Sequence, residues 1–325
     1  MEKKLFLTMV AAAFMLASCG NEENEVKESW NGEIRLSSSI EAQTRAAHGL
    51  DQVLKKGESV HVWIDDSKSP NADITAENLY KNKVLTVEAD SKLSGGETMY
   101  FPQSGNTVNI YALHTNTTLT GDEFPGELTH TVAQDQKVAT ATAGAGYQGS
   151  DLVYAKVTGQ ARTADAISLT FTHMLSKIEV VLVKGAGVSD ITSAEILNTK
   201  LKAVFTPSKT ADFTVVTDNA ETITDSNPIE IDCGITTQDV VTNNQEANIT
   251  LNEAIIVPQT LAVNTEFIRI NGNLIYKLPA EKTFEAGKKY RYIVTANLSG
   301  LTVKSSIDDW TTPETGGSES GDANM

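Results

Sequence analysis

Cysteine and basic residues are scarce in this chain of 325 residues. The two cysteines, Cys19 and Cys233, are too few for a disulfide framework, a four-cysteine zinc site or an iron–sulfur cluster. Lys and Arg total 26 against 42 Asp and Glu, which gives a net charge of −16. Because a phosphate backbone requires a basic surface, this excess of acid argues against nucleic acid as a partner.

Motifs of catalysis and cofactor binding are also absent. The sequence contains no G-x-S-x-G nucleophile elbow, no P-loop and no H-E-x-x-H. Residues 144–149 fit the string G-x-G-x-x-G, but residues 151–155 indicate a strand where a dinucleotide site requires a helix, so we predict a loop. The five histidines stand at no metal-ligand spacing, and Asp65 and Asp66 are predicted to be solvated turn residues. We therefore expect no enzyme, no metal site and no cofactor.

The N-terminus has the pattern of a secretory signal. Two lysines precede an apolar run at residues 5–16, which is too short to span a bilayer. The run ends in Leu-Ala-Ser-Cys at residues 16–19, which resembles the lipobox of bacterial lipoproteins. We expect residues 1–18 to be removed as a signal peptide and Cys19 to carry a lipid. An ordinary signal peptide followed by an incidental cysteine is the alternative.

Residues 19–32 are predicted to form a lipidated acidic tether, because the like-charged run at residues 20–25 cannot collapse onto itself. The run resembles the acidic export signal of surface lipoproteins of the Bacteroidetes, and a plain solvated linker is the alternative interpretation. No second apolar stretch is long enough to span a membrane, so the lipid is the only anchor that we expect.

The rest of the chain is rich in strand patterns. Threonine, a β-branched residue, occurs 38 times. Apolar side chains alternate with polar ones over residues 33–42, which predicts a strand with one buried face. That face carries Ile34, Leu36, Ile40 and Ala42.

About sixteen such segments, separated by Gly, Asn, Asp and Ser, predict an all-β protein of two sandwiches. At about 100–200 residues per domain, the length also favours two domains. We place them at residues 33–165 and 166–310. Residues 311–325 have linker composition and are predicted to be a disordered tail.

Eight segments occur in an order that resembles the fimbrillin family, in its Mfa-like branch, over nearly the whole mature chain. They include Gln-Thr-Arg-Ala, Met-Tyr-Phe-Pro-Gln-Ser-Gly, Thr-His-Met-Leu-Ser-Lys-Ile and Phe-Glu-Ala-Gly-Lys-Lys-Tyr. The resemblance implies two transthyretin-like β-sandwich domains in tandem. It also implies an outer membrane lipoprotein at the cell surface that serves as a pilus subunit, supports adhesion and binds other pilin subunits. The segments lie at residues 43–46, 99–105, 108–112, 151–155, 169–178, 256–259, 284–292 and 307–310.

The same resemblance implies a processing step. In this family an extracellular Arg-specific protease cuts after an arginine that follows the first strand, and Arg45 before Ala46 is the matching position. The cut would release the first strand and leave an apolar groove with unpaired backbone groups, which a strand of another subunit could fill. The tail looks unlike such a donor strand, and residues 301–307 are the better candidate. The family also includes tip and anchor subunits, and an anchor would instead keep its first strand and its lipid.

A surface glycan-binding lipoprotein is the alternative from a different class. Such proteins stack sugars on exposed aromatic side chains. Aromatic residues make up 6% of this chain, and the three tryptophans are Trp30, Trp63 and Trp310. We expect Trp310 and His173 to have roles in core packing.

Overall fold

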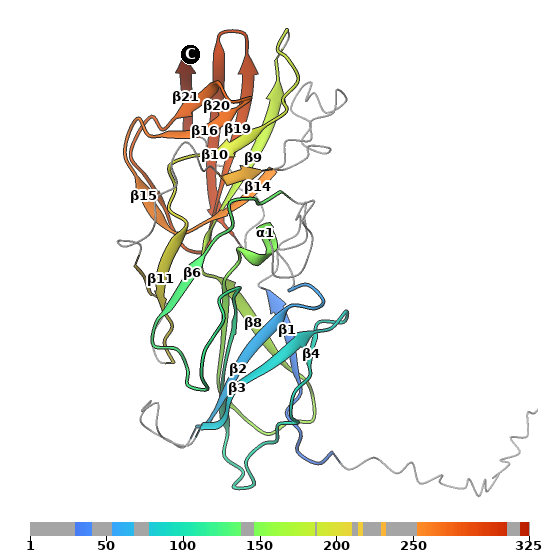
Figure 1. Ribbon diagram of the computed structural model, residues 1–325. Helices are drawn as coiled ribbons and strands as arrows, with labels where there is room; N and C mark the ends of the chain where they lie inside the picture. The colour runs from blue at the N-terminus through green and yellow to red at the C-terminus, as the bar shows by residue number, and fades with distance from the viewer. Residues whose placement is uncertain are drawn as a thin grey trace, which may run out of the picture. The chain divides into compact units, whose positions relative to one another are not determined.

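The computed structural model describes residues 30–40, 54–67, 78–137, 146–185, 187–209, 214–216, 229–231, 252–310 and 319–324. Contacts between Cα atoms divide the chain into residues 1–31 and residues 32–325, and the description below concerns the second unit. Its regular structure is almost entirely strand, with a single-turn helix α1 (Gly146–Gly149) among the described residues (Figure 1). The prediction of an all-β protein is confirmed.

Seven strands form a closed barrel in the order β1-β4-β3-β2-β5-β7-β8, with β8 pairing back to β1. All neighbours are antiparallel except β1 and β8, which are parallel. Side chains alternate between the interior and the surface, as the sequence pattern predicts. The strands are β1 (Leu36–Ile40), β2 (Ser59–Asp66), β3 (Asn78–Val87), β4 (Lys92–Ser94), β5 (Val108–His114), β7 (Val153–Gln160) and β8 (Ile167–His173).

The remaining strands form four further sheets, whose orders are β14-β9-β19-β20-β21, β13-β10-β16-β17, β12-β11-β6 and β15-β18. The pairing of β6 with β11 joins residues on either side of position 165. The strands are β6 (Leu128–Thr131), β9 (Ser176–Lys184), β10 (Ala194–Ile196), β11 (Lys202–Thr206), β12 (Thr214–Val216), β13 (Ile229–Ile231), β14 (Asn252–Ile256), β15 (Gln259–Leu261), β16 (Glu266–Ile270), β17 (Leu274–Lys277), β18 (Lys282–Phe284), β19 (Lys288–Asn297), β20 (Gly300–Asp309) and β21 (Glu319–Asn324).

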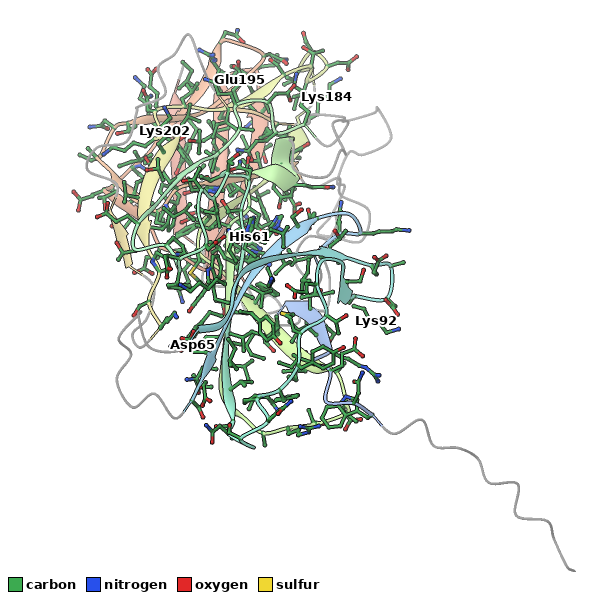
Figure 2. All side chains as sticks on the ribbon, turned by 60° about the horizontal axis from the view of Figure 1, so that its bottom comes forward. His61, Asp65, Lys92, Lys184, Glu195 and Lys202 are labelled. Atoms are coloured by element: carbon green, nitrogen blue, oxygen red, sulfur yellow. The ribbon has the colours of Figure 1, made fainter. Side chains whose placement is uncertain are left out.

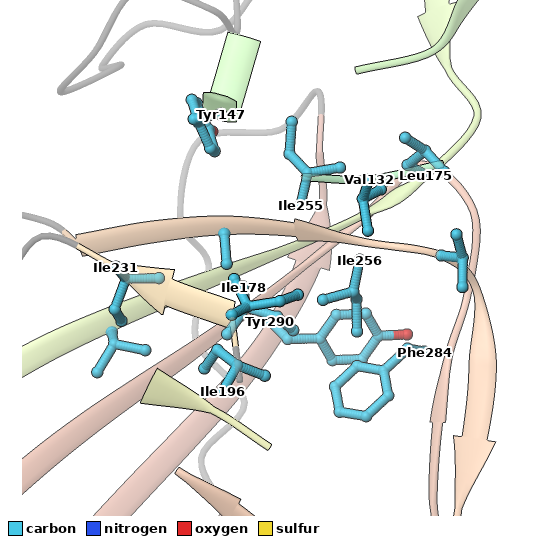
Figure 3. Close-up of a cluster of buried hydrophobic side chains, with 14 of the residues drawn as sticks. Val132, Tyr147, Leu175, Ile178, Ile196, Ile231, Ile255, Ile256, Phe284 and Tyr290 are labelled. Atoms are coloured by element: carbon cyan, nitrogen blue, oxygen red, sulfur yellow. The ribbon is translucent and has the colours of Figure 1, made fainter. Parts of the chain in front are cut away.

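A contiguous cluster of buried apolar side chains fills the space between the sheets (Figure 3). Ile178 of β9 and Ile256 of β14 lie in it beside the rings of Phe284 and Tyr290, whose centroids are 4.8 Å apart. The Tyr290 hydroxyl donates to the carbonyl of Thr283 and accepts from the backbone N–H of residue 285, so its polar end is satisfied inside the core.

Two segments differ from the expectation for the C-terminus. Residues 319–324, which were predicted to belong to a disordered tail, form β21 and pair with β20 through six residues. The open edge of a sheet offers unpaired backbone groups, which can pair with a segment of almost any composition. Residues 301–307, the predicted donor, lie within β20, which is held by β19 on one side over ten residues and by β21 on the other. A strand with ten register pairs to one neighbour and six to the other is poorly suited to leave its own sheet.

Candidate functional site: the groove that holds strand β1

Strand β1 closes the barrel by pairing with a different neighbour on each side. It is parallel to β8 through five residues, from Leu36 opposite Ile167 to Ile40 opposite Phe171. On its other side it is antiparallel to β4 through only two pairs, one of which is Ser37 opposite Lys92. Figure 2 shows Lys92 on β4, near β1. Since no other strand among the described residues joins β4 to β8, the closed barrel depends on β1.

The inward face of this segment is well buried. Ile34, Leu36 and Ser38 are 5%, 3% and 4% exposed, while the residues between them lie partly or largely in solvent. The Ser38 hydroxyl donates to the carbonyl oxygen of Ser91 at 3.2 Å, and its backbone N–H donates to the same oxygen at 2.8 Å. A serine therefore occupies the middle of the buried face of β1, where an apolar side chain would bury more apolar surface.

The outward face of β1 is held by weaker contacts. The Ser39 hydroxyl lies 3.1 Å from that of Ser168 and 3.4 Å from that of Thr170, both on β8, and these contacts are exposed to solvent. Hydroxyl pairs that compete with water contribute little net stability, about 0.5–1.5 kcal/mol each at most.

Before β1, the chain continues along the barrel but changes partner. The backbone N–H of Ile34 donates to the carbonyl of Met99 at 2.8 Å, and that of Phe101 donates to the carbonyl of Gly32 at 2.9 Å. Residues 95–98 loop out between these contacts and the pairing with β4. A pocket of about 480 Å³ opens beside Ile34 and Leu36 at this point.

The structure places some of the predicted site residues and not others. Ile34 and Leu36 lie on one buried face, as the alternation predicts. The backbone of Ile40 continues β1, but its side chain lies outside the described residues, as do all of Cys19, Ala42, Arg45 and Ala46. Lipidation, Arg45 cleavage and displacement of the strand therefore remain predictions.

Sequence reasoning missed Ser38, because only apolar side chains were counted on the inner face. Its position, two residues from Leu36, gives the signal that could have identified it, since every second residue of a strand lies on the same face.

His130 is a core residue. His130 is fully buried; its Nε2–H donates to the carbonyl of Ser150 at 2.9 Å, and its Nδ1 accepts from the hydroxyl of Thr115 at 3.0 Å. Burial of this ring lowers its pKa to about 4, against a smaller opposing effect of the Ser150 carbonyl. Within the described part of the chain, no three His, Cys, Asp or Glu side chains are grouped so that they could hold a metal ion.

His173 and Trp310 are also core residues, which confirms the prediction for both. Their rings stack at 3.9 Å with an angle of 3° between the planes, and His173 Nδ1 lies 3.0 Å from a carboxylate oxygen of Asp151. Trp310 and Trp63 are 0% and 1% exposed, so neither can stack on a sugar. This observation weakens the alternative of a glycan-binding protein.

The prediction of solvated turn residues is wrong for Asp65 and Asp66. Both lie in β2, on which Figure 2 labels Asp65. Asp65 forms an ion pair with Lys209 at 2.6 Å, and Asp66 accepts hydrogen bonds from the amide of Asn106. The prediction failed because these carboxylates find partners that are distant in the sequence.

The glycine string also has a local structural role. The helix α1 lies within it and is followed directly by β7, without the longer helix that a dinucleotide site requires. No helix in the part of the chain that the structure describes is long and apolar enough to cross a membrane.

Comparison with known proteins identifies the class. The sequence profile of the fimbrillin-like family matches residues 44–310. A protein of Bacteroides uniformis named "Putative fimbrium subunit Fim1C" is 25% identical over 99% of this chain and 100% of its own length. The chain belongs to the fimbrillin-like family.

Solved structures show the same fold. A crystal structure described as a "putative cell adhesion protein" from Bacteroides uniformis is 21% identical, with a TM-score of 0.56, over 86% of this chain and 100% of its own. Another with the same description, from Bacteroides ovatus, is 17% identical, with a TM-score of 0.58, over 86% of this chain and 97% of its own.

Proposed function

We propose that this protein is a non-enzymatic structural subunit of a cell-surface pilus that supports adhesion and assembles by exchange of strand β1. In this proposal it is exported as an outer membrane lipoprotein through Cys19. An extracellular Arg-specific protease then cuts between Arg45 and Ala46. The observation that carries the proposal is that β1, the described strand nearest before Arg45, alone joins β4 to β8. Its loss would open a barrel without edges into a sheet with two unpaired edges.

The energetics support replacement of β1 rather than its simple loss. Removal of β1 would uncover the sites of Ile34 and Leu36, each worth about 1.5–3 kcal/mol when fully buried. Together these side chains contribute about 3–6 kcal/mol, before the cost of ordering the strand is counted. A strand of another fimbrillin-like subunit could regain this free energy by burying apolar side chains at the same sites, while its main chain hydrogen-bonds to both edges.

The finer organisation is part of the same proposal. The family resemblance favours two transthyretin-like sandwiches in tandem, divided near residue 165, with residues 1–18 as signal peptide and residues 19–32 as tether. A tip or anchor subunit is the alternative role, and an anchor would keep both β1 and its lipid.

A disulfide between β1 and β4 tests the proposal. Ser37 and Lys92 are directly opposite in an antiparallel pair, where Cα atoms lie about 4.5–5.5 Å apart, within the range that a disulfide spans. The double variant Ser37→Cys/Lys92→Cys, made in residues 20–325, is oxidised, treated with an Arg-specific protease and followed by N-terminal sequencing and particle size. The single variant Ser37→Cys is the matched control.

We expect both proteins to be cut before Ala46. Only the control should grow into multimers, and the locked variant should begin to do so when the disulfide is reduced. Multimers of the oxidised double variant at the control rate would show that β1 need not leave, and would refute strand exchange. Cleavage without multimers in either protein would favour the tip or anchor role.

A further inference from the structure

The pairing of the chain beside β1 contains a large irregularity. Ile34 contacts Met99 and Leu36 pairs with Leu93. An interval of two residues on the segment of β1 therefore lies opposite an interval of six residues on the segment that begins in β4. The four extra residues are Gly-Gly-Glu-Thr at positions 95–98, and positive φ angles of 106° and 71° at the two glycines allow the backbone to loop outward. The pocket of about 480 Å³ lies between this loop and β1.

The floor of the pocket is apolar. Leu85, Leu93 and Met99 line it and are at most 8% exposed as whole residues, while Ile34 and Leu36 form the wall on the side of β1. The pocket is thus continuous with the groove in which β1 lies, and shares its apolar side chains.

Four of the five charged side chains that line the pocket lie in ion pairs. Lys83 lies 2.8 Å from Glu97, Lys92 lies 2.5 Å from Asp90, and Arg35 lies 3.4 Å from Glu33. The fifth, Glu88, accepts a hydrogen bond from the hydroxyl of Ser94. Because most of these charges already have partners, the apolar floor favours an uncharged apolar side chain as occupant.

We propose that this pocket is the first docking site for the incoming strand of a second fimbrillin-like subunit, which places one apolar side chain there while β1 is still bound. This inference rests on the proposed strand exchange and adds that the incoming strand binds before β1 leaves. The groove favours a strand as occupant, because Ile34 and Leu36 show that an extended segment can place apolar side chains there. A strand that docks first can replace β1 residue by residue, so that the apolar floor is never wholly exposed to water.

Filling the pocket tests the proposal. Thr98 and Ala166 are exposed, line the pocket and belong to segments distant in the sequence, so Thr98→Trp and Ala166→Trp are two independent substitutions that add bulk to it. Thr118, also exposed but outside the pocket, gives the matched control Thr118→Trp. Each variant of residues 20–325 is cut after Arg45 and mixed with a fluorescent peptide of residues 33–42, and incorporation is followed over time.

In the wild type and the control, we expect the rate of peptide incorporation to rise in proportion to peptide concentration. Both filling variants should incorporate the peptide about tenfold more slowly, the factor expected when one apolar side chain cannot be buried at the encounter. Their final bound fraction and thermal unfolding midpoint should equal those of the control, which a general loss of structure would not allow.

Unchanged rates in both filling variants, or a rate independent of peptide concentration, would overturn the docking role while leaving strand exchange intact. If no peptide enters even the wild type, strand exchange itself is refuted, and the docking role with it.

Discussion

Replacement of Leu36 by alanine tests how firmly β1 is held. Leu→Ala substitutions in cores cost about 2–5 kcal/mol, with the larger values where the surroundings cannot fill the space left behind. Leu36 is 3% exposed and lies beside a pocket of about 480 Å³, so part of its surroundings is already open. We therefore expect Leu36→Ala to lower the free energy of unfolding by about 2 kcal/mol, the low end of the range.

Leu169 provides the comparison within the same barrel. It lies on β8 opposite Ser38, is 0% exposed and does not line this pocket. Leu169→Ala should therefore cost about 4 kcal/mol. Urea unfolding of both variants in residues 20–325 at pH 7 gives the two values. A cost for Leu36→Ala equal to or greater than that for Leu169→Ala would refute the argument that the β1 groove is loosely packed on this side.

Three further predictions concern buried polar and aromatic groups elsewhere in the protein. Between pH 6.5 and about 4, His130 is protonated in the unfolded chain but neutral in the folded protein. The free energy of unfolding should therefore fall by about 3 kcal/mol as the pH drops through that window. Urea unfolding of His130→Gln should show a smaller dependence of the free energy of unfolding on pH in this window. An unchanged dependence would contradict its assignment to His130. Lys177, fully buried and 2.7 Å from Glu253, should cost about 3–5 kcal/mol when changed to Met, and Glu253→Gln in the same chain should recover part of that loss. Trp310→Ala should lower the free energy of unfolding by about 3–5 kcal/mol through loss of the stack on His173, while Trp310→Phe should cost less.

The strand content could be predicted from the sequence because alternation is a local property. The segment around Leu36 shows a period of two, and the structure gives it a buried and an exposed face. What alternation does not reveal is the neighbour of each strand. The parallel pairing of Leu36 with Ile167 spans more than a hundred residues, and no local pattern distinguishes it from other partners.

The buried polar residues were beyond prediction for a related reason. Lys177 and Glu179 stand two apart in β9, which by alternation alone suggests a solvated face. Both are at most 3% exposed, because Glu253 on the neighbouring strand β14 completes an ion cluster with them. A buried charge is tolerated only with such partners, and these come from parts of the chain far apart in the sequence.

The strand that closes the barrel is also weakly secured. Strand β20 pairs with β19 through ten residues, whereas β1 pairs with β4 through two. Serine occupies three consecutive positions of β1, one of them buried, and a pocket lies beside its first residue. A strand selected only for stability would have apolar or β-branched side chains at these positions. The combination of a topologically essential position with weak attachment is what replacement by another strand requires, since the incoming strand can then bind more tightly than the one that it displaces.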